Sequence, residues 1–192
     1  SAEADVSGVR QNMIPRAGGN TTHFSFFGNY TNDKLASTSN VDDQNLVTLN
    51  TKLWDVNPTI GGPIKQNRLW YFAAYRYWGN YERPPGAYYD TDPADNVYTK
   101  DLSRPGINQN WNQSEDLRLT WQANAKNKFS LWADDLQRCT CHWFLASNVS
   151  PDAAAVLRTY PNLMVQATWN APITNKFLID AGITFHPESW SL

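Results

Sequence analysis

Hydrophobic and polar residues alternate over short stretches of this chain, which predicts β-strands with two different faces. In the most regular stretch, one face of the predicted strand would carry Leu117, Leu119 and Trp121, and the other face Asp116, Arg118, Thr120 and Gln122. The same pattern recurs along the chain and predicts strands within 22–32, 52–64, 68–82, 113–124, 127–138, 161–171 and 176–186. We expect each strand to pair antiparallel with the next.

The connections between these strands alternate in length. Short turns are predicted near 62–67, 124–127 and 172–175, and long polar loops over 31–51, 79–112 and 136–161. Outer-membrane barrels alternate short periplasmic turns with longer outer loops, and strands of about ten residues suit a tilted bilayer crossing. The predicted fold class is therefore all-β, an antiparallel meander forming part of a transmembrane β-barrel. A secreted or surface β-sandwich that binds glycans or protein is the alternative.

The stretch 68–82 carries aromatic residues on both faces, with Arg76 between Trp rings on one of them. An arginine buried in a dry apolar core is costly, so we expect its face to meet a polar lumen. The lumen-facing polar candidates are Arg76, Asp116, Arg118, Asp134, Asp180 and His186. Thr120 and Thr184 are expected to meet water or protein on that face. The lipid-facing candidates are Leu117, Leu119, Trp121, Phe177, Ile179 and Ile183.

Composition agrees with a membrane-facing surface built from strands. Aromatic residues make up 14% of the 192 residues, although the mean hydropathy is −0.57. Aromatic rings suit the two membrane interfaces, and the predicted girdle residues are Trp54, Tyr75, Tyr77, Trp121, Trp169 and Phe185. The net charge of −2 offers no basic excess for nucleic acid, and no apolar run is long enough for a transmembrane helix.

Reactive side chains are few and scattered. Cys139 and Cys141 precede His142, but C-x-C is shorter than usual zinc-ligand spacing, so we expect a loop disulfide or two thiols there. The three histidines fall in separate predicted elements, and no nucleophile elbow, H-E-x-x-H or P-loop is present. We therefore expect no enzyme activity, no metal and no cofactor.

Three segments carry a family resemblance. Residues 9–20, Val-Arg-Gln-Asn-Met-Ile-Pro-Arg-Ala-Gly-Gly-Asn, with His23 and 26–29, Phe-Phe-Gly-Asn, resemble the plug-to-barrel junction of TonB-dependent outer-membrane receptors of the Oar-like branch. Residues 61–64, Gly-Gly-Pro-Ile, followed by 67–72, Asn-Arg-Leu-Trp-Tyr-Phe, resemble the first periplasmic turn of that branch and its next strand. Residues 172–176, Pro-Ile-Thr-Asn-Lys, are similar to a later turn.

The resemblance implies a domain organisation and partners. Residues 1–20 would be the end of the plug domain and the junction, and 21–192 the N-terminal part of an incomplete barrel. The whole protein would reside in the bacterial outer membrane, contact its lipid and take up a small ligand, with siderophore, cobalamin, oligosaccharide and peptide all open. A periplasmic energy-coupling protein would act through a missing N-terminal part. We expect the chain to be an internal fragment of such a receptor.

Overall fold

The computed structural model describes residues 16–35, 47–95 and 97–191, and these form an all-β structure. A single short 3-10 turn, η1 (Pro151–Ala153), interrupts the strands. The strands are β1 (His23–Asn32), β2 (Leu49–Lys65), β3 (Leu69–Arg83), β4 (Tyr88–Asp90), β5 (Lys100–Pro105), β6 (Asn108–Asn124), β7 (Asn127–Trp143), β8 (Ala155–Thr174), β9 (Phe177–Phe185) and β10 (Glu188–Ser191).

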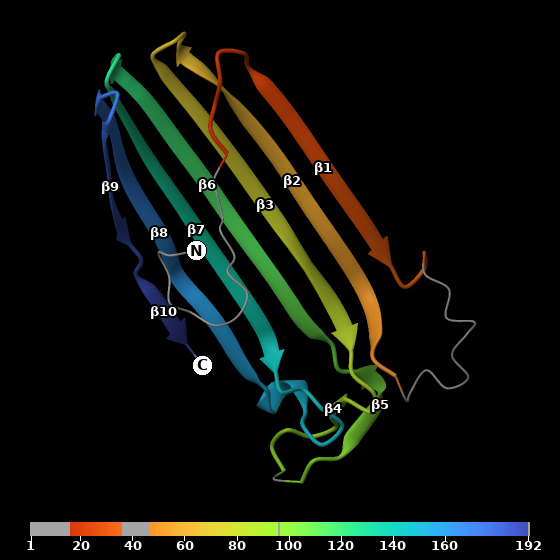
Figure 1. Cartoon of the computed structure of the whole chain (residues 1–192). Coiled ribbons are helices and arrows are strands. Elements are labelled where there is room, and N and C mark those ends of the chain that lie inside the picture. Colours follow the sequence, from red (N-terminus) through yellow and green to blue (C-terminus); the bar gives the residue numbers. More distant parts are fainter. Residues whose placement is uncertain (1–15, 36–46, 96, 192) are drawn as a thin grey trace.

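The main sheet is an antiparallel meander, as predicted. Its order is β1-β2-β3-β6-β7-β8, with β9 and β10 both pairing with β8, and the sheet is not closed. The small β4–β5 hairpin lies within the connection from β3 to β6. The short turns gather at one end of the sheet, and the longer connections with β4 and β5 gather at the other (Figure 1). We call these the turn end and the loop end.

β9 and β10 act as one strand interrupted by a proline. Val165 is opposite Phe185 and Asn162 is opposite Glu188, and between them the Leu163 N–H donates to the Pro187 carbonyl at 3.2 Å. Proline has no N–H to give to the ladder, so the strand bends there instead of ending. The predicted strand 176–186 agrees with β9, which ends at Phe185, whereas β10 was not predicted.

The predicted loops at the loop end are too long. β7 runs to Trp143, β8 begins at Ala155 and β6 begins at Asn108, so much of 136–161 and the end of 79–112 are strand. Asn110 is opposite Thr140 and Asn112 is opposite Arg138 in this extension. Polar residues on both faces give no alternation to recognise, whereas the backbone ladder needs only N–H and C=O groups.

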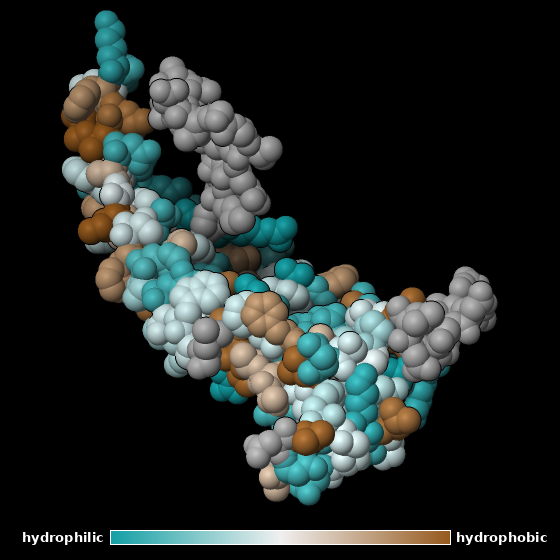
Figure 2. Space-filling view, turned by 90° about the horizontal axis from the view of Figure 1, so that it is seen from below, coloured by the Kyte–Doolittle hydropathy of each residue, from teal (hydrophilic) through white to brown (hydrophobic). Residues whose placement is uncertain are grey.

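Register across the sheet separates an apolar face from a polar face. One row through β1, β2, β3, β6, β7, β8 and β9 contains no polar side chain: Phe24, Ile60, Ala73, Leu117, Ala133, Val165 and Phe185. The adjacent row points to the other side and holds His23, Gly61, Phe72, Arg118, Trp132, Gln166 and Thr184. The sheet is curved when viewed from below, and hydrophobic residues gather along its outer edge (Figure 2).

No second layer of described residues covers the apolar face. Ile183 is 72% exposed, Phe24 is 66% exposed and Leu117 is 49% exposed, which is unusual for side chains of this size in a folded domain. Among the described residues, no helix is long and apolar enough to cross a membrane.

Candidate functional site: the polar face and the segment that crosses it

An ion pair between β2 and β3 occupies the polar face. The Arg76 guanidinium donates from Nε to Asp55 Oδ1 at 3.0 Å and from Nη2 to Asp55 Oδ2 at 2.7 Å. Its central carbon lies 4.5 Å from the ring centroid of Trp78. The bidentate geometry and the stacked ring fix the position of Arg76. Arg76 is thus exposed to solvent and paired with Asp55 on the polar face.

A second polar cluster joins β6 and β7. Asp116 and Asp134 are directly opposite in register. The Trp132 indole N–H donates to Asp116 Oδ2 at 2.6 Å, and the Ser114 hydroxyl donates to Asp134 Oδ1 at 2.8 Å. Arg118 is opposite Trp132 on the same face. Each carboxylate is therefore held by a neutral donor from the neighbouring strand.

The other two lumen candidates lie toward the far edge of the sheet. Asp180 is opposite Asn170 and shares the polar face, whereas His186 lies beyond the end of β9. The His186 ring Nε2 is 2.7 Å from Asn162 Oδ1. The predicted residues thus spread from β3 to the segment after β9, and the described structure does not bring them together. Among the described residues, no group of three His, Cys, Asp or Glu side chains is placed to hold a metal ion.

One of the two threonines expected to meet water or protein on this face is buried. Thr120 is only 3% exposed and its hydroxyl has no hydrogen-bond partner among the described residues, whereas Thr184 is exposed. Thr120 stands between Trp70 and Ser130 in its row, in the centre of the sheet, where neighbouring side chains cover a short one. Of the two surroundings expected for Thr120, water is therefore excluded, and its side chain is covered by protein.

The segment before β1 crosses the polar face near the turn end and is tied to the β2–β3 turn (Figure 1). Asn20 Oδ1 accepts hydrogen bonds from the Asn67 backbone N–H at 2.8 Å and from the Trp70 indole N–H at 2.7 Å. Asn20 Nδ2 also donates to Asn67 Oδ1 at 2.5 Å. Asn67 has a φ of 58°, a left-handed conformation that asparagine tolerates in tight turns. One side chain therefore joins two parts of the chain that are 47 residues apart.

Backbone contact reinforces this clamp, because Gly18 lies directly against the sheet. A Cβ at Gly18 would overlap the Tyr71 carbonyl oxygen and come within 3.1 Å of the Gly62 carbonyl oxygen. A Cβ at Gly19 would meet nothing within 4 Å. Only the first glycine of the pair is thus required for close approach.

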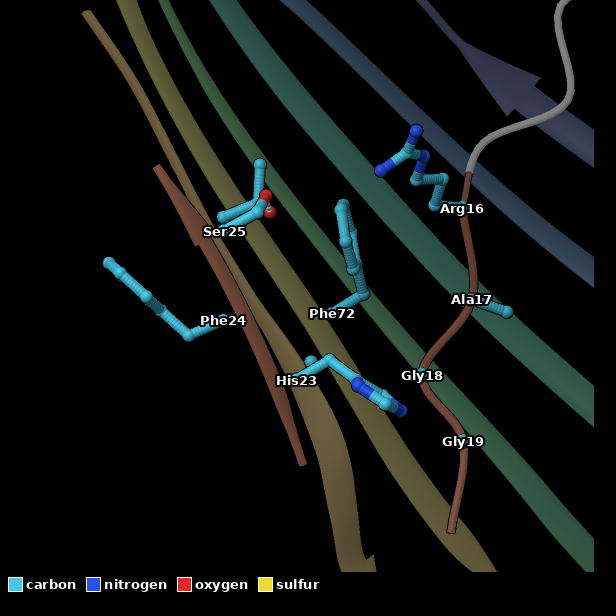
Figure 3. A pocket seen from close by; sticks show the side chains of 10 residues that line it. Arg16, Ala17, Gly18, Gly19, His23, Phe24, Ser25 and Phe72 are labelled. Carbon is cyan, nitrogen blue, oxygen red and sulfur yellow. Dashed lines mark hydrogen bonds between the residues drawn. The ribbon is translucent and has the colours of Figure 1, made fainter. Parts of the chain in front are cut away.

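A hollow of about 290 Å³ lies between the crossing segment and the sheet. In Figure 3 the His23 ring points toward Gly18 and Gly19, and Phe72 projects into the space between β1 and the segment. Ser25 and Thr59 form a hydroxyl pair at 2.6 Å along the same wall. The sequence analysis identified the motif at residues 9–20 and the motif at residues 61–72, but it did not predict that they are in contact. Two sequence features could have indicated this contact: the Gly-Gly-Asn run at residues 18–20 and Asn67 in the tight turn.

Aromatic side chains on the apolar face form two clusters. Phe129 stacks between Trp121 (ring centroids 5.7 Å apart) and Trp169 (6.3 Å) near the turn end. The second cluster lies toward the loop end. The ring centroid of Trp54 is 5.5 Å from that of Tyr77 and 5.2 Å from that of Tyr81, and the ring centroids of Tyr77 and Trp111 are 6.3 Å apart. These clusters include Phe129, Tyr81 and Trp111, which were not among the predicted girdle residues. Phe185 was predicted as a girdle residue, but it lies in the row of Leu117, apart from both clusters.

The cysteines and the loop hairpin complete the loop end. Cys139 and Cys141 form a disulfide within β7, so they belong to a strand and not to the predicted loop.

In the β4–β5 hairpin, the Ser103 hydroxyl and N–H both donate to Asp101 Oδ1, at 2.6 and 3.0 Å. These bonds hold the pKa of the Asp101 carboxyl below its usual value.

The site is therefore a two-sided wall and not a compact centre. Charged residues, an ion pair and a crossing segment occupy one face, and exposed apolar residues occupy the turn-side half of the other. No protein-family model, no curated protein and no solved structure matches this chain.

Proposed function

We propose that this chain is part of the barrel wall of an outer-membrane receptor of the TonB-dependent kind, in the Oar-like branch. The observation that carries the proposal is the contrast between the two faces. Beyond the Leu117 row, two further rows of the apolar face carry no charged or amide side chain: Tyr71, Leu119, Leu131, Ala167 and Ile183, then Leu69, Trp121, Phe129, Trp169 and Ala181. Such a surface is stable in hydrocarbon and costly in water.

The crossing segment supports the receptor reading in particular. In that reading, residues 16–22 carry the chain from a plug to the wall, and the Asn20 clamp fixes where it enters the polar face. The predicted end of the plug, apart from residues 16–20, lies outside the described residues. The polar face, with Arg76 and Asp134, would then line the lumen and contact the plug or a passing solute.

A soluble β-sandwich is the competing proposal. It requires a second sheet on the apolar face, and the described residues supply none. A further domain or a partner protein would have to cover that face. The energy-coupling protein and the ligand, whether siderophore, cobalamin, oligosaccharide or peptide, are part of the receptor proposal and not of the sandwich.

Cysteine labelling of the full-length protein in intact bacteria tests the proposal. Asp92→Cys lies in the loop-end hairpin connection, and Lys126→Cys lies in the β6–β7 turn; both positions are exposed. A membrane-impermeant maleimide should label Asp92→Cys in intact cells and Lys126→Cys only after the outer membrane is permeabilised. Equal labelling of both in intact cells, or release of the protein without detergent, would favour the sandwich.

A further inference from the structure

The hollow between the crossing segment and the sheet has basic groups and hydroxyl groups in its walls. Arg16 contributes a guanidinium from the crossing segment, and His23 contributes an imidazole from β1. Ser25 and Thr59 add their hydroxyls, and none of the residues that line the hollow is Asp or Glu. Among the described residues, no carboxylate forms an ion pair with Arg16 or His23. A hollow lined by charge of one sign favours an anion.

The lining groups also have hydrogen bonds to donate. Arg16 presents a planar fork of N–H groups that matches a carboxylate, and an imidazole carries an N–H in either protonation state. Ser25 and Thr59 use one hydroxyl proton in their 2.6 Å contact, which leaves the second proton for another acceptor. In Figure 3 the Arg16 side chain leaves the crossing segment on the side that faces β1. An anion in the hollow would therefore meet donors from both the segment and the sheet.

The floor of the hollow is open because Gly61 has no side chain. Gly61 stands between His23 and Phe72 in one row of the polar face. Two strand spacings, about 10 Å, separate these two neighbours. A Cβ at Gly61 would lie 3.0 Å from Phe72 Cδ2, so the Phe72 ring lies against the glycine. The backbone of Gly18 and Gly19 lines the same hollow from the crossing segment. Glycine backbone and the face of a ring suit a flat ligand.

The volume limits that ligand to a small molecule. An apolar cavity of about 150 Å³ accommodates benzene. The hollow, at about 290 Å³, has room for one aromatic ring with a carboxylate.

We propose that the hollow binds a small planar aromatic carboxylate. The carboxylate accepts hydrogen bonds from Arg16 and His23, and the ring lies between Phe72 and the glycine backbone. This site goes beyond the proposed function, because it requires only the docked crossing segment and strands β1 to β3, and no lipid surface.

Calorimetric titration of the full-length protein in detergent micelles tests the proposal, with benzoate as the probe. Benzoate should bind about tenfold more tightly than benzamide, which keeps the ring without the charge, and than acetate, which keeps the charge without the ring. Arg16→Gln should weaken benzoate binding about tenfold, which corresponds to about 1.4 kcal/mol. Lys65→Gln removes a positive charge at the exposed end of β2, outside the hollow, and should leave the affinity unchanged.

A second variant tests the shape of the site. Gly61→Ala places a methyl group in the floor of the hollow and keeps every charged group, so it should also weaken benzoate binding. Equal affinity of wild type and Arg16→Gln for benzoate would overturn the proposal, as would equal affinity for benzoate and benzamide. Inorganic phosphate that binds as tightly as benzoate would indicate a general anion site and overturn the preference for a ring. Cysteine labelling that contradicts the membrane location would leave these binding results unaffected.

Discussion

The turn-side and loop-side halves of the sheet share one backbone ladder but differ in their side chains. In the turn-side half, the row of Leu119 and Leu131 on the outer surface is apolar, and its neighbour with Arg118 is polar. In the loop-side half, the same outer surface pairs Glu115 with Asp135 and Gln113 with Gln137. Pairing continues to Asn110 and Thr140, and the outer surface there mixes these polar pairs with the aromatic cluster of Trp54, Tyr77 and Trp111. Side-chain alternation is thus confined to one half of the sheet, whereas hydrogen bonds between backbones decide where each strand ends.

The largest effect expected from this contrast is an arginine on the outer surface of the turn-side half. If the chain is part of a barrel wall as proposed and Ile183 lies near the bilayer midplane, Ile183→Arg should destabilise the full-length protein in lipid vesicles by about 2–4 kcal/mol. Thr184→Arg, one residue along on the polar face, should change the free energy of unfolding by less than about 0.5 kcal/mol. Denaturant titration in vesicles measures both.

Equal costs at Ile183 and Thr184 would remove the lipid–lumen alternation. This pair is a better test than Leu119 and Thr120, because Thr120 is 3% exposed and an arginine there would be damaging in any medium.

A slightly smaller effect is expected where the crossing segment touches the turn-side half. Gly18→Ala places a methyl group against the Tyr71 carbonyl oxygen, so we expect a loss of about 1–3 kcal/mol in unfolding free energy. Gly19→Ala has open space around its new Cβ and should be neutral or slightly stabilising. A Gly18→Ala variant as stable as Gly19→Ala would show that the segment does not dock on the sheet.

The Asn20 clamp should contribute less than the backbone contact. Asn20→Ala removes three hydrogen bonds that are partly open to water, so we expect the free energy of unfolding to fall by about 1–2 kcal/mol. Trypsin should also cleave faster after Arg16. Asn20→Asp keeps the acceptor for the Trp70 indole and should recover part of the loss.

The matched control for the clamp is Asn50→Ala at the loop end. This substitution removes one exposed hydrogen bond, which Asn80 Nδ2 donates to Asn50 Oδ1 at 3.2 Å, and should lower the free energy of unfolding by under about 0.5 kcal/mol. If Asn50→Ala costs as much as Asn20→Ala, the clamp has no special role.

The smallest effect belongs to the loop-side half. Gln113→Arg and Asn112→Arg place the same charge on opposite faces, and both should stay within about 0.5 kcal/mol of wild type. The same vesicle titration measures them. A loss of several kcal/mol at Gln113 alone would mean that lipid extends over the loop-side half as well, which would erase the difference between the halves.

The sequence by itself determined the strands of the turn-side half, their antiparallel order and their two faces. Alternation such as that of Leu117, Arg118 and Leu119 is a local property, and each short turn joins neighbours. Only the tertiary structure decided where β7 ends and β8 begins, that β10 follows beyond Pro187, that Thr120 is covered, and that Asn20 bonds to Asn67 and Trp70. These features depend on backbone partners, neighbouring rows and contacts between residues far apart in the chain. No local pattern of side chains encodes them.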